Sequence, residues 1–316
     1  MKKILSFLVR VGISAGILIF LFRRIDLERI IGVLAGINKP VLILASLLIL
    51  SAYIIGFFRW KILLEGVDLN LSRSLILRSF CIGFFSNLFF PSTIGGDLCR
   101  SADLSLLSSK PRQVVASVVL DRLSGYAALA VVAFGALLLG YRLVTETAVF
   151  FALGVIAVLL AGILMILFNN FIFSKVSKFL SLFGRAGEAL SSLHCEIYKF
   201  REKKKIISKS FLYSLIIQLT IPFSFYLLSL ALATKISLVY FFIFVPIIAT
   251  ISALPVSIGG LGLREASSMF FFTTVGMSAE IAVTISLLSF FIIFLLGIAG
   301  GVIYVFAFSS RRLQRD

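Results

Sequence analysis

The sequence predicts an all-α fold, a polytopic transmembrane helical bundle built from two inverted half-repeats, each with a broken or re-entrant helix. Three observations predict it. Hydrophobic residues make up 60% of the 316 residues and charged residues only 14%, whereas soluble domains carry about 25% charged residues. Several apolar runs reach the roughly 20 residues that cross a bilayer. A ten-residue pattern with proline, paired glycines and arginine occurs at matched places in the two halves.

The net charge of +16 has an explanation in the membrane itself. Lys and Arg gather beside apolar runs, as the positive-inside bias and anionic lipid headgroups produce. We therefore expect no nucleic-acid partner. The three cysteines have no spacing that indicates disulfides, and no Cys/His cluster has metal-ligand spacing, so no cofactor is predicted. The single histidine, His194, is expected to be solvated in a polar loop.

Nine apolar runs define the predicted elements. They cover residues 4–22, 40–58, 75–94, 113–139, 147–168, 206–233, 238–254, 266–277 and 280–306. The first run resembles a signal peptide, but Arg10 interrupts its apolar core, so we interpret it as a retained span. Four apolar residues after this run lie near one helical face and predict a short interfacial helix. They are Ile25, Ile30, Ile31 and Leu34.

Basic residues predict the orientation of the bundle. The longest polar connection, residues 169–209, carries nine basic and three acidic residues and is therefore assigned to the cytoplasm. The C-terminal SSRRLQRD belongs on the same side. Counting spans then places both termini in the cytoplasm and the protein in the cell (inner) membrane, at the cost of leaving the four basic residues between 23 and 39 outside.

Two elements are predicted to be re-entrant. The run 266–277 is too short to cross unaided and pairs with 238–254 as a hairpin that enters from outside. By the same count, 75–94 enters from inside. Residues 98–112 are polar for a returning helix, so a full span at 75–94 stays an alternative.

The chain is therefore expected to form a single membrane domain over residues 1–316, with about six spans and two re-entrant elements. The half-repeats cover about 1–140 and 141–316. Inverted repeats whose broken helices meet near the bilayer midplane are the plan of many secondary transporters.

The repeated pattern is P-x-x-I-G-G-x-x-x-R. It reads PSTIGGDLCR at 91–100 and PVSIGGLGLR at 255–264. Pro91 and Pro255 lack an amide hydrogen and disfavour helix in the residue before them. The glycine pairs tolerate dihedral angles and close approaches that other residues do not; they are Gly95, Gly96, Gly259 and Gly260. Each motif is predicted to end one helix and start another.

The restarted helices are predicted to bind anions. A helix N-terminus presents N–H groups and a partial positive charge, and the guanidinium groups of Arg100 and Arg264 match phosphate. Two such sites inside a membrane suit a phospholipid or polyprenyl-phosphate headgroup. The alternative is structural, because Pro and Gly are common in membrane helices. In that case Arg100 pairs with Asp97 and Arg264 extends to an interface.

Further charges lie within or beside apolar runs, where ionisable groups are expensive and are usually functional or paired. Asp121 and Arg122 are adjacent, so they point to different helix faces and need separate partners. Arg100 and Arg264 are candidates to pair with Asp121. Glu265 is expected either to stabilise a helix N-terminus or to carry a proton.

Two arginines are predicted to lie near the membrane surface. Arg59 follows the aromatic pair Phe57 and Phe58, which favours an interface anchor. Arg78 lies near the start of its apolar run and is expected to extend toward the headgroups.

These motifs resemble the transmembrane, flippase-like domain family of lysylphosphatidylglycerol synthases, which also occurs as stand-alone membrane proteins. The family pattern has an arginine after the second span and segments P-x-x-x-G-D-x-x-R, E-R-L-x-D and L-P-x-S-x-G-G-x-G-x-R-E. The matching residues are Arg59, Pro91 with Gly96, Asp97 and Arg100, DRLSG at 121–125, and LPVSIGGLGLRE at 254–265. Asp121 replaces the usual glutamate, and Gly125 stands where the family has an acid. The resemblance covers nearly the whole chain.

The resemblance implies a module that binds or translocates anionic, aminoacylated or polyprenyl-linked lipids. Aminoacyl transfer in the full-length synthases belongs to a separate soluble domain, and only ten residues follow Phe306. We therefore expect a lipid transporter rather than an enzyme. Arg100 and Arg264 would contact phosphate. The acidic residues would orient them or contact a headgroup amine; they are Asp97, Asp121 and Glu265.

Two other functions stay open. An integral-membrane lipid transferase would use Asp97 or Asp121 as a base. A non-catalytic protein would instead partner a lipid-modifying enzyme or a glycosyltransferase. The chain lacks a G-x-x-x-x-G-K-[ST] segment, so transport would be gradient-driven, facilitative or coupled to a partner.

Overall fold

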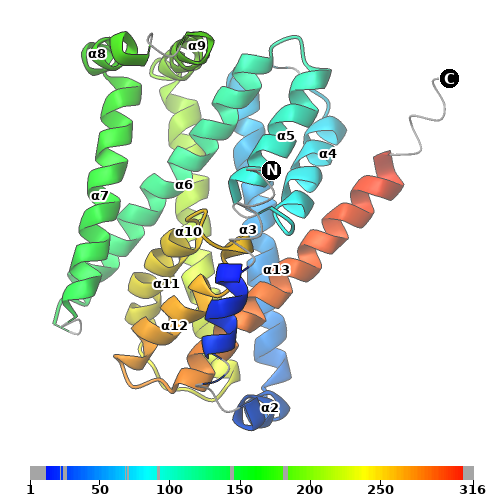
Figure 1. Cartoon of the computed structure of the whole chain (residues 1–316). Helices are drawn as coiled ribbons and strands as arrows, with labels where there is room; N and C mark the ends of the chain where they lie inside the picture. Colours follow the sequence, from blue (N-terminus) through cyan, green and yellow to red (C-terminus); the bar gives the residue numbers. More distant parts are fainter. Residues whose placement is uncertain are drawn as a thin grey trace.

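The computed structural model describes residues 12–21, 23, 27–67, 69, 71–90, 93–142, 146–180 and 184–308, and all regular secondary structure in these ranges is helical. The elements are α2 (Leu27–Ala35), α3 (Lys39–Gly66), α4 (Arg73–Ser86), α5 (Thr93–Leu107), α6 (Pro111–Leu139), α7 (Thr147–Phe168), α8 (Asn170–Leu180), α9 (Arg185–Lys199), α10 (Lys204–Ala231), α11 (Leu238–Ser252), η2 (Ile258–Gly260), α12 (Leu263–Thr273) and α13 (Ala279–Phe308). They pack as a bundle (Figure 1). The predicted polytopic helical bundle is confirmed.

Five described helices are long and apolar enough to cross a membrane: α3, α6, α7, α10 and α13. The shortest of them, α7, has 22 residues and is about 33 Å long, enough for a hydrocarbon core of about 30 Å. The first predicted span, 4–22, lies only partly within the described residues, where Gly12–Leu21 forms a short apolar helix.

Two pairs of shorter helices form hairpins. The first pair is α4 and α5, with 14 and 15 residues, and the second is α11 and α12, with 15 and 11 residues. Each helix is about 23 Å long or less, too short to cross the hydrocarbon core alone. The alternative of a full span at 75–94 is therefore wrong, because α4 ends at Ser86 and α5 returns along it. The charges that made α5 look too polar face inward.

The hairpins enter the bundle from opposite ends, and their connecting loops face each other near its middle (Figure 1). The backbone oxygen of Asn87 lies 4.0 Å from the position that a Cβ atom on Gly259 would occupy. The tips of the two hairpins thus lie close together. An inverted repeat requires two hairpins that enter from opposite ends of the bundle. The inverted repeat itself stays a prediction.

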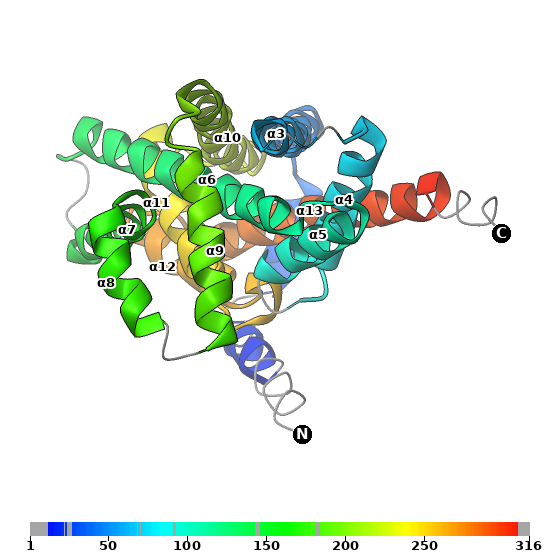
Figure 2. The same cartoon turned by 90° about the horizontal axis from the view of Figure 1, so that it is seen from above.

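The ends of the bundle are closed by helices that lie across it. The connection at 169–209 is largely helical, and α8 and α9 lie across one end, the end toward which α13 also runs (Figures 1 and 2). His194 on α9 is buried and stacks on Phe173 of α8 with ring centroids 3.4 Å apart. The expectation of a solvated histidine is wrong, because the two helices pack against each other and enclose the ring.

The predicted interfacial helix is α2, which lies across the other end (Figure 1). Its Ile30 is buried against Leu21 and Val283, whereas Ile31 and Leu34 are exposed. Ile25 lies outside the described residues. The apolar residues of α2 therefore divide between the bundle and its surroundings instead of sharing one face.

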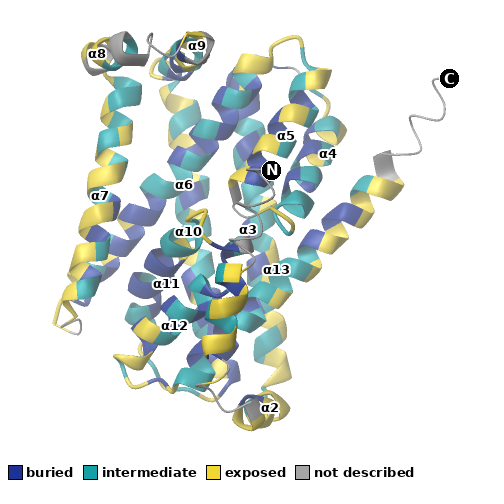
Figure 3. Ribbon diagram, in the orientation of Figure 1, coloured by how far each residue is buried: buried dark blue, intermediate teal, exposed yellow. Residues whose placement is uncertain are grey.

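The bundle is apolar outside as well as inside. Exposed residues follow the outer faces of α3, α7 and α13 (Figure 3), and many are large and hydrophobic, such as Leu47, Val158 and Phe306. Apolar surface of this extent is unusual for a soluble protein and normal for helices that contact lipid. Several charged side chains are buried instead; they are Asp97, Arg100, Asp121 and Glu265.

Candidate functional site

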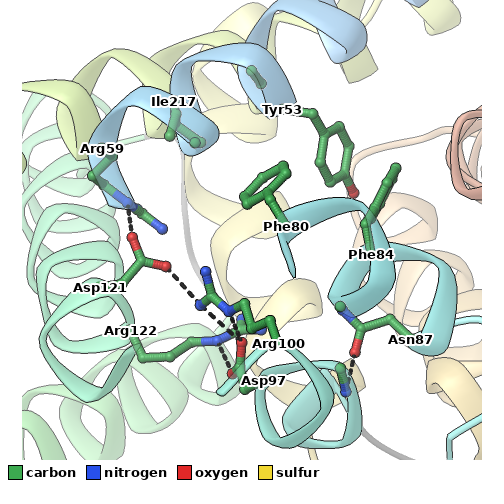
Figure 4. Close-up of a pocket in the computed structure, with 14 residues that line it drawn as sticks. Tyr53, Arg59, Phe80, Phe84, Asn87, Asp97, Arg100, Asp121, Arg122 and Ile217 are labelled. Carbon is green, nitrogen blue, oxygen red and sulfur yellow. Dashed lines mark hydrogen bonds and ion pairs between the residues drawn. The ribbon is translucent and has the colours of Figure 1, made fainter. Parts of the chain in front are cut away.

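Arginines and aspartates from three helices meet inside the bundle (Figure 4). Asp121 of α6 is 3% exposed. It accepts hydrogen bonds from Arg59 Nε of α3 at 2.6 Å and from Arg100 Nη2 of α5 at 2.9 Å. Arg100 was one of its two candidate partners. The prediction that Arg59 anchors the chain at the interface is wrong, because its guanidinium turns inward to the aspartate.

The second carboxylate, Asp97, extends this network. It accepts a hydrogen bond from Arg100 Nε at 3.0 Å and another from Arg122 Nε. Both Arg100 and Asp97 lie on α5 three positions apart, so they share a helix face. The resulting chain alternates in charge, from Arg59 through Asp121, Arg100 and Asp97 to Arg122. Alternation of this kind offsets the desolvation cost of each buried charge.

Glycines of the first motif bring α5 close to α4. A side chain on Gly96 would overlap the carbonyl oxygen of Gly83 and the side chain of Asn87, and one on Gly95 would overlap Phe90. Asn87 Oδ1 also accepts a hydrogen bond from the Gly96 N–H at 2.9 Å. The glycine pair thus permits close helix packing, which positions the charges of α5. Pro91 lies outside the described residues.

Glycines of the second motif have a different role. Gly259, Gly260 and Gly262 adopt φ values of 57°, 78° and 84°, the left-handed region that favours glycine. They lie in the connection between α11 and α12, after Pro255. The glycine pair of the second motif is therefore needed for its backbone conformation.

Glu265 caps the N-terminus of α12. Its Oε2 accepts a hydrogen bond from the Gly262 N–H at 2.6 Å, and its Oε1 accepts one from Ser286 Oγ at 3.0 Å. The carboxylate is fully buried. Of the two roles predicted for Glu265, the structure contains the contacts of helix stabilisation.

Arg264 lies apart from the charge network. Its Nε is 3.6 Å from Glu265 Oε1, its Nη2 donates to the Gly259 carbonyl at 3.4 Å, and its guanidinium carbon lies 4.9 Å from the centre of the Phe290 ring. A contact of this kind is favourable for a cation. Arg264 therefore belongs to the second hairpin and faces a different cavity from Arg100.

Two adjoining cavities lie where the hairpin tips meet. The first has a volume of about 170 Å³ and is bordered by all five charges of the network. The second has a volume of about 310 Å³ and is bordered by Arg122, Arg264 and mainly apolar residues of α10, α11 and α13. Four residues border both cavities; they are Tyr53, Phe84, Asn87 and Arg122. A charged cavity thus adjoins an apolar one.

The site carries an excess of positive charge. Among the described residues, its charged side chains are four arginines and three carboxylates. They are Arg59, Arg100, Arg122, Arg264, Asp97, Asp121 and Glu265. One positive charge is left over, in a part of the molecule where an uncompensated charge is costly.

Sequence reasoning missed several partners. Arg78 donates to Asp103 Oδ1 at 3.0 Å, so it pairs inside the hairpin instead of extending to the headgroups as predicted. Arg59 also donates to Ser214 Oγ at 3.0 Å, and its Nη1 lies 3.2 Å from the Cβ position of Gly125. A serine hydroxyl therefore contacts Arg59 beside the position where the family has an acid.

Metal binding has no obvious ligand set in this part of the chain. In the described ranges, no three His, Cys, Asp or Glu side chains are grouped closely enough to hold a metal ion. The polar groups of the site are guanidinium, carboxylate, amide and phenol, of which guanidinium groups bind anions.

Fold and site together define a multi-pass helical membrane protein with a buried, arginine-rich cavity between two hairpin tips. The chain belongs to the family described as the lysylphosphatidylglycerol synthase TM region, whose model matches residues 7–301. It is also similar to the UPF0104 membrane protein PH1989 of Pyrococcus horikoshii. The two are 26% identical, over 94% of this chain and 96% of the relative. The family resemblance inferred from the motifs is confirmed.

Proposed function

We propose that this protein binds a membrane lipid through its anionic headgroup and moves that lipid between leaflets, without altering it chemically. The observation that carries the proposal is the pair of adjoining cavities at the hairpin tips. An arginine-rich cavity suits a phosphate-bearing headgroup, and the apolar cavity beside it suits an acyl or prenyl chain.

The two hairpins suit a translocation path. The helices of each hairpin are too short to cross the bilayer, so each hairpin ends inside the membrane. Its polar tip must then face protein or a water-filled cavity, and such a cavity could open to one side of the membrane. In secondary transporters, broken helices of this kind place a substrate site at the point where two halves meet. The corresponding point here is the cavity that both Asn87 and Gly259 border.

The headgroup would meet side chains from both motifs. The motifs assign phosphate contacts to Arg100 and Arg264; we keep this contact for Arg264, and the more enclosed Arg100 holds the carboxylates beside the headgroup. The glycine pairs of the two motifs would allow close approach of the backbone. Asp97 and Asp121 orient arginines, as their contacts indicate. The substrate class is an anionic, aminoacylated or polyprenyl-phosphate lipid.

Orientation follows from basic residues. We place the protein in the cell membrane with α8, α9 and the end of α13 in the cytoplasm, because the connection at 169–209 carries nine basic residues against three acidic ones. The N-terminus would lie on the same side.

A transferase function is less well supported by the geometry. A general base needs a carboxylate oxygen within reach of the proton that it removes. Asp97 and Asp121 each accept hydrogen bonds from two arginines, which directs their oxygens toward guanidinium groups instead of a substrate.

Reconstitution tests the proposal. Purified protein is placed in liposomes that contain phosphatidylglycerol with a fluorescent acyl chain, and dithionite quenches the fluorophore in the outer leaflet. We expect the protected half of the signal to become accessible in the presence of protein, and this exchange to be lost in Arg264→Ala.

Two results would contradict the proposal. A mass change of the labelled lipid would indicate transferase chemistry. Exchange no faster than in protein-free liposomes, with each of phosphatidylglycerol, lysylphosphatidylglycerol and a polyprenyl phosphate, would indicate a non-catalytic partner of a lipid-modifying enzyme or glycosyltransferase.

A further inference from the structure

We propose that Arg122 is the residue that binds the phosphate of the headgroup first, and that Arg100 is a positioning residue that holds the carboxylates. This inference rests on the proposed function and assigns its first binding step to one side chain. It differs from the sequence motif, which pointed to Arg100.

Exposure separates the three arginines of the charge network. The side chain of Arg100 is 7% exposed, that of Arg59 is 13% exposed, and that of Arg122 is 38% exposed. A ligand that enters the cavity first meets the arginine whose side chain is most exposed. That residue is Arg122.

Arg100 is enclosed by its partners. Its Nε and Nη2 lie within 3.0 Å of carboxylate oxygens of Asp97 and Asp121, and its guanidinium carbon lies 4.7 Å from the centre of the Trp60 ring. A phosphate on Arg100 would have to displace a carboxylate from a buried pair, which is costly. Its contacts fit a residue that joins α5 to α6.

Arg122 lies at the boundary of the two cavities. It borders both the charged cavity and the apolar one, and its Nε contacts Asp97 at the end of the alternating chain (Figure 4). A phosphate beside Arg122 would place the headgroup in the charged cavity and leave the lipid chain in the apolar one. Arg264 borders the same apolar cavity and is placed to receive the headgroup next.

Charge balance supports the same assignment. The network runs from Arg59 to Arg122 with two carboxylates between three arginines, so both ends are cationic. An anion of one negative charge at Arg122 would continue the alternation and cancel the excess charge of the site. A phosphodiester carries that charge.

The lone tryptophan provides a reporter for binding. Trp60 is the single tryptophan of the chain, and its ring contacts the guanidinium of Arg100. Arg100 in turn is ion-paired with Asp97, which also contacts Arg122. Dihexanoyl phosphatidylglycerol is titrated into the detergent-solubilised protein while Trp60 fluorescence is followed, and calorimetry measures the same dissociation constant independently. Dihexanoyl phosphatidylcholine and glycerol phosphate are the comparison ligands.

We expect saturable binding of the phosphatidylglycerol and a Kd at least tenfold weaker in Arg122→Gln. Arg122→Lys should recover part of the affinity, because it keeps the charge and loses the planar geometry. Arg112→Gln, on the exposed start of the same helix, is the matched control and should bind as the wild type does. Arg264→Gln should bind within about threefold of wild type and exchange lipid more slowly.

Folding of the variant can be checked separately. Arg122→Gln leaves Asp97 and Asp121 joined through Arg100, so its melting temperature should fall less than that of Arg100→Gln. Arg100→Gln removes the link between Asp97 and Asp121 and should lower the melting temperature. The two variants should therefore differ in stability as well as in affinity.

Three outcomes decide the matter. Unchanged affinity in folded Arg122→Gln would overturn the assignment to Arg122 and leave the proposed function standing. No saturable binding by the wild-type protein with either method would overturn both. Glycerol phosphate binding as tightly as the lipid would overturn the lipid as the source of the phosphate.

Discussion

The α4–α5 and α11–α12 hairpins carry the same ten-residue pattern and use it in different ways. In the first hairpin Gly95 and Gly96 lie inside the helix α5, and their lack of a side chain lets α5 pack on α4. In the second hairpin Gly259 and Gly260 have positive φ angles and form the turn before α12. Identical residues satisfy a packing need in one place and a conformational need in the other.

The arginines of the two motifs also have different partners. The arginine of the first motif lies between two carboxylates from different helices. The arginine of the second lies beside Glu265, which caps its own helix. The first hairpin is therefore joined to a neighbouring helix by ion pairs, whereas the ion pair of the second lies within α12. We expect substitutions in the first to have the greater effect.

The largest effect should come from Asp121→Asn. This change leaves the buried Arg59 and Arg100 without their shared carboxylate, which should cost about 3–5 kcal/mol of unfolding free energy. Glu265→Gln keeps a hydrogen-bonding group at the α12 N-terminus and should cost about 1 kcal/mol. SDS unfolding in mixed micelles measures both. Equal losses would contradict the contrast between the hairpins.

A smaller effect is expected for Gly96→Ala. The added methyl group would meet the Gly83 backbone and Asn87, and such overpacking costs about 1–3 kcal/mol. Gly135→Ala is the matched control, because nothing lies within 4 Å of its Cβ position in α6. The control should be neutral or stabilising by up to about 1 kcal/mol. Thermal unfolding in detergent compares the pair, and equal melting temperatures would remove the packing argument.

The stability of Gly259 variants should depend on whether the new side chain tolerates a positive φ angle, and not on its size. Gly259→Ala should cost about 1 kcal/mol, because alanine disfavours the left-handed region. Gly259→Asn should cost less, since asparagine tolerates that region. At Gly96 the order should reverse, with asparagine worse than alanine. The melting temperatures of the four variants test this reversal. The same order at both positions would show that the two glycines share one role.

The smallest effect concerns pH and lies outside the hairpins. Burial lowers the pKa of His194 below its usual value of 6.5, so the unfolded state binds the proton more readily than the folded state does. The stabilisation by the neutral ring is fully present above pH 6.5 and declines as the pH falls through the lowered pKa.

Hydrogen exchange of α9, corrected for intrinsic rates, should therefore be faster at pH 5.5 than at pH 7.5. His194→Phe should abolish the difference, because phenylalanine can occupy the stacked position on Phe173 and does not titrate. An equal pH effect in the wild type and in His194→Phe would show that another group titrates.

Much of the fold follows from apolar run length. The run 147–168 coincides with α7, and the starts of α3, α6, α10 and α13 fall within two residues of the predicted runs. Helix breaks at the two motifs were also predictable, because Pro and Gly act on the local backbone. What the motif glycines contact depends on residues elsewhere in the chain and was not predictable.

The site was predicted in its residue types and only partly in its pairings. Asp97 and Arg100 are three residues apart, so their contact follows from helix geometry. The pairing of Arg59 with Asp121 spans 62 positions and depends on how α3 packs beside α6. The aromatic residues next to Arg59 favoured a membrane interface, and tertiary packing overrode that local signal.

The most direct test of the account is an experimental structure of the protein in nanodiscs that contain phosphatidylglycerol. We predict density for a phosphate within hydrogen-bonding distance of the Arg122 guanidinium, with a lipid chain in the cavity that Arg264 also borders. Hairpin tips that are separated in the structure, or headgroup density confined to the outside of the bundle, would contradict the account.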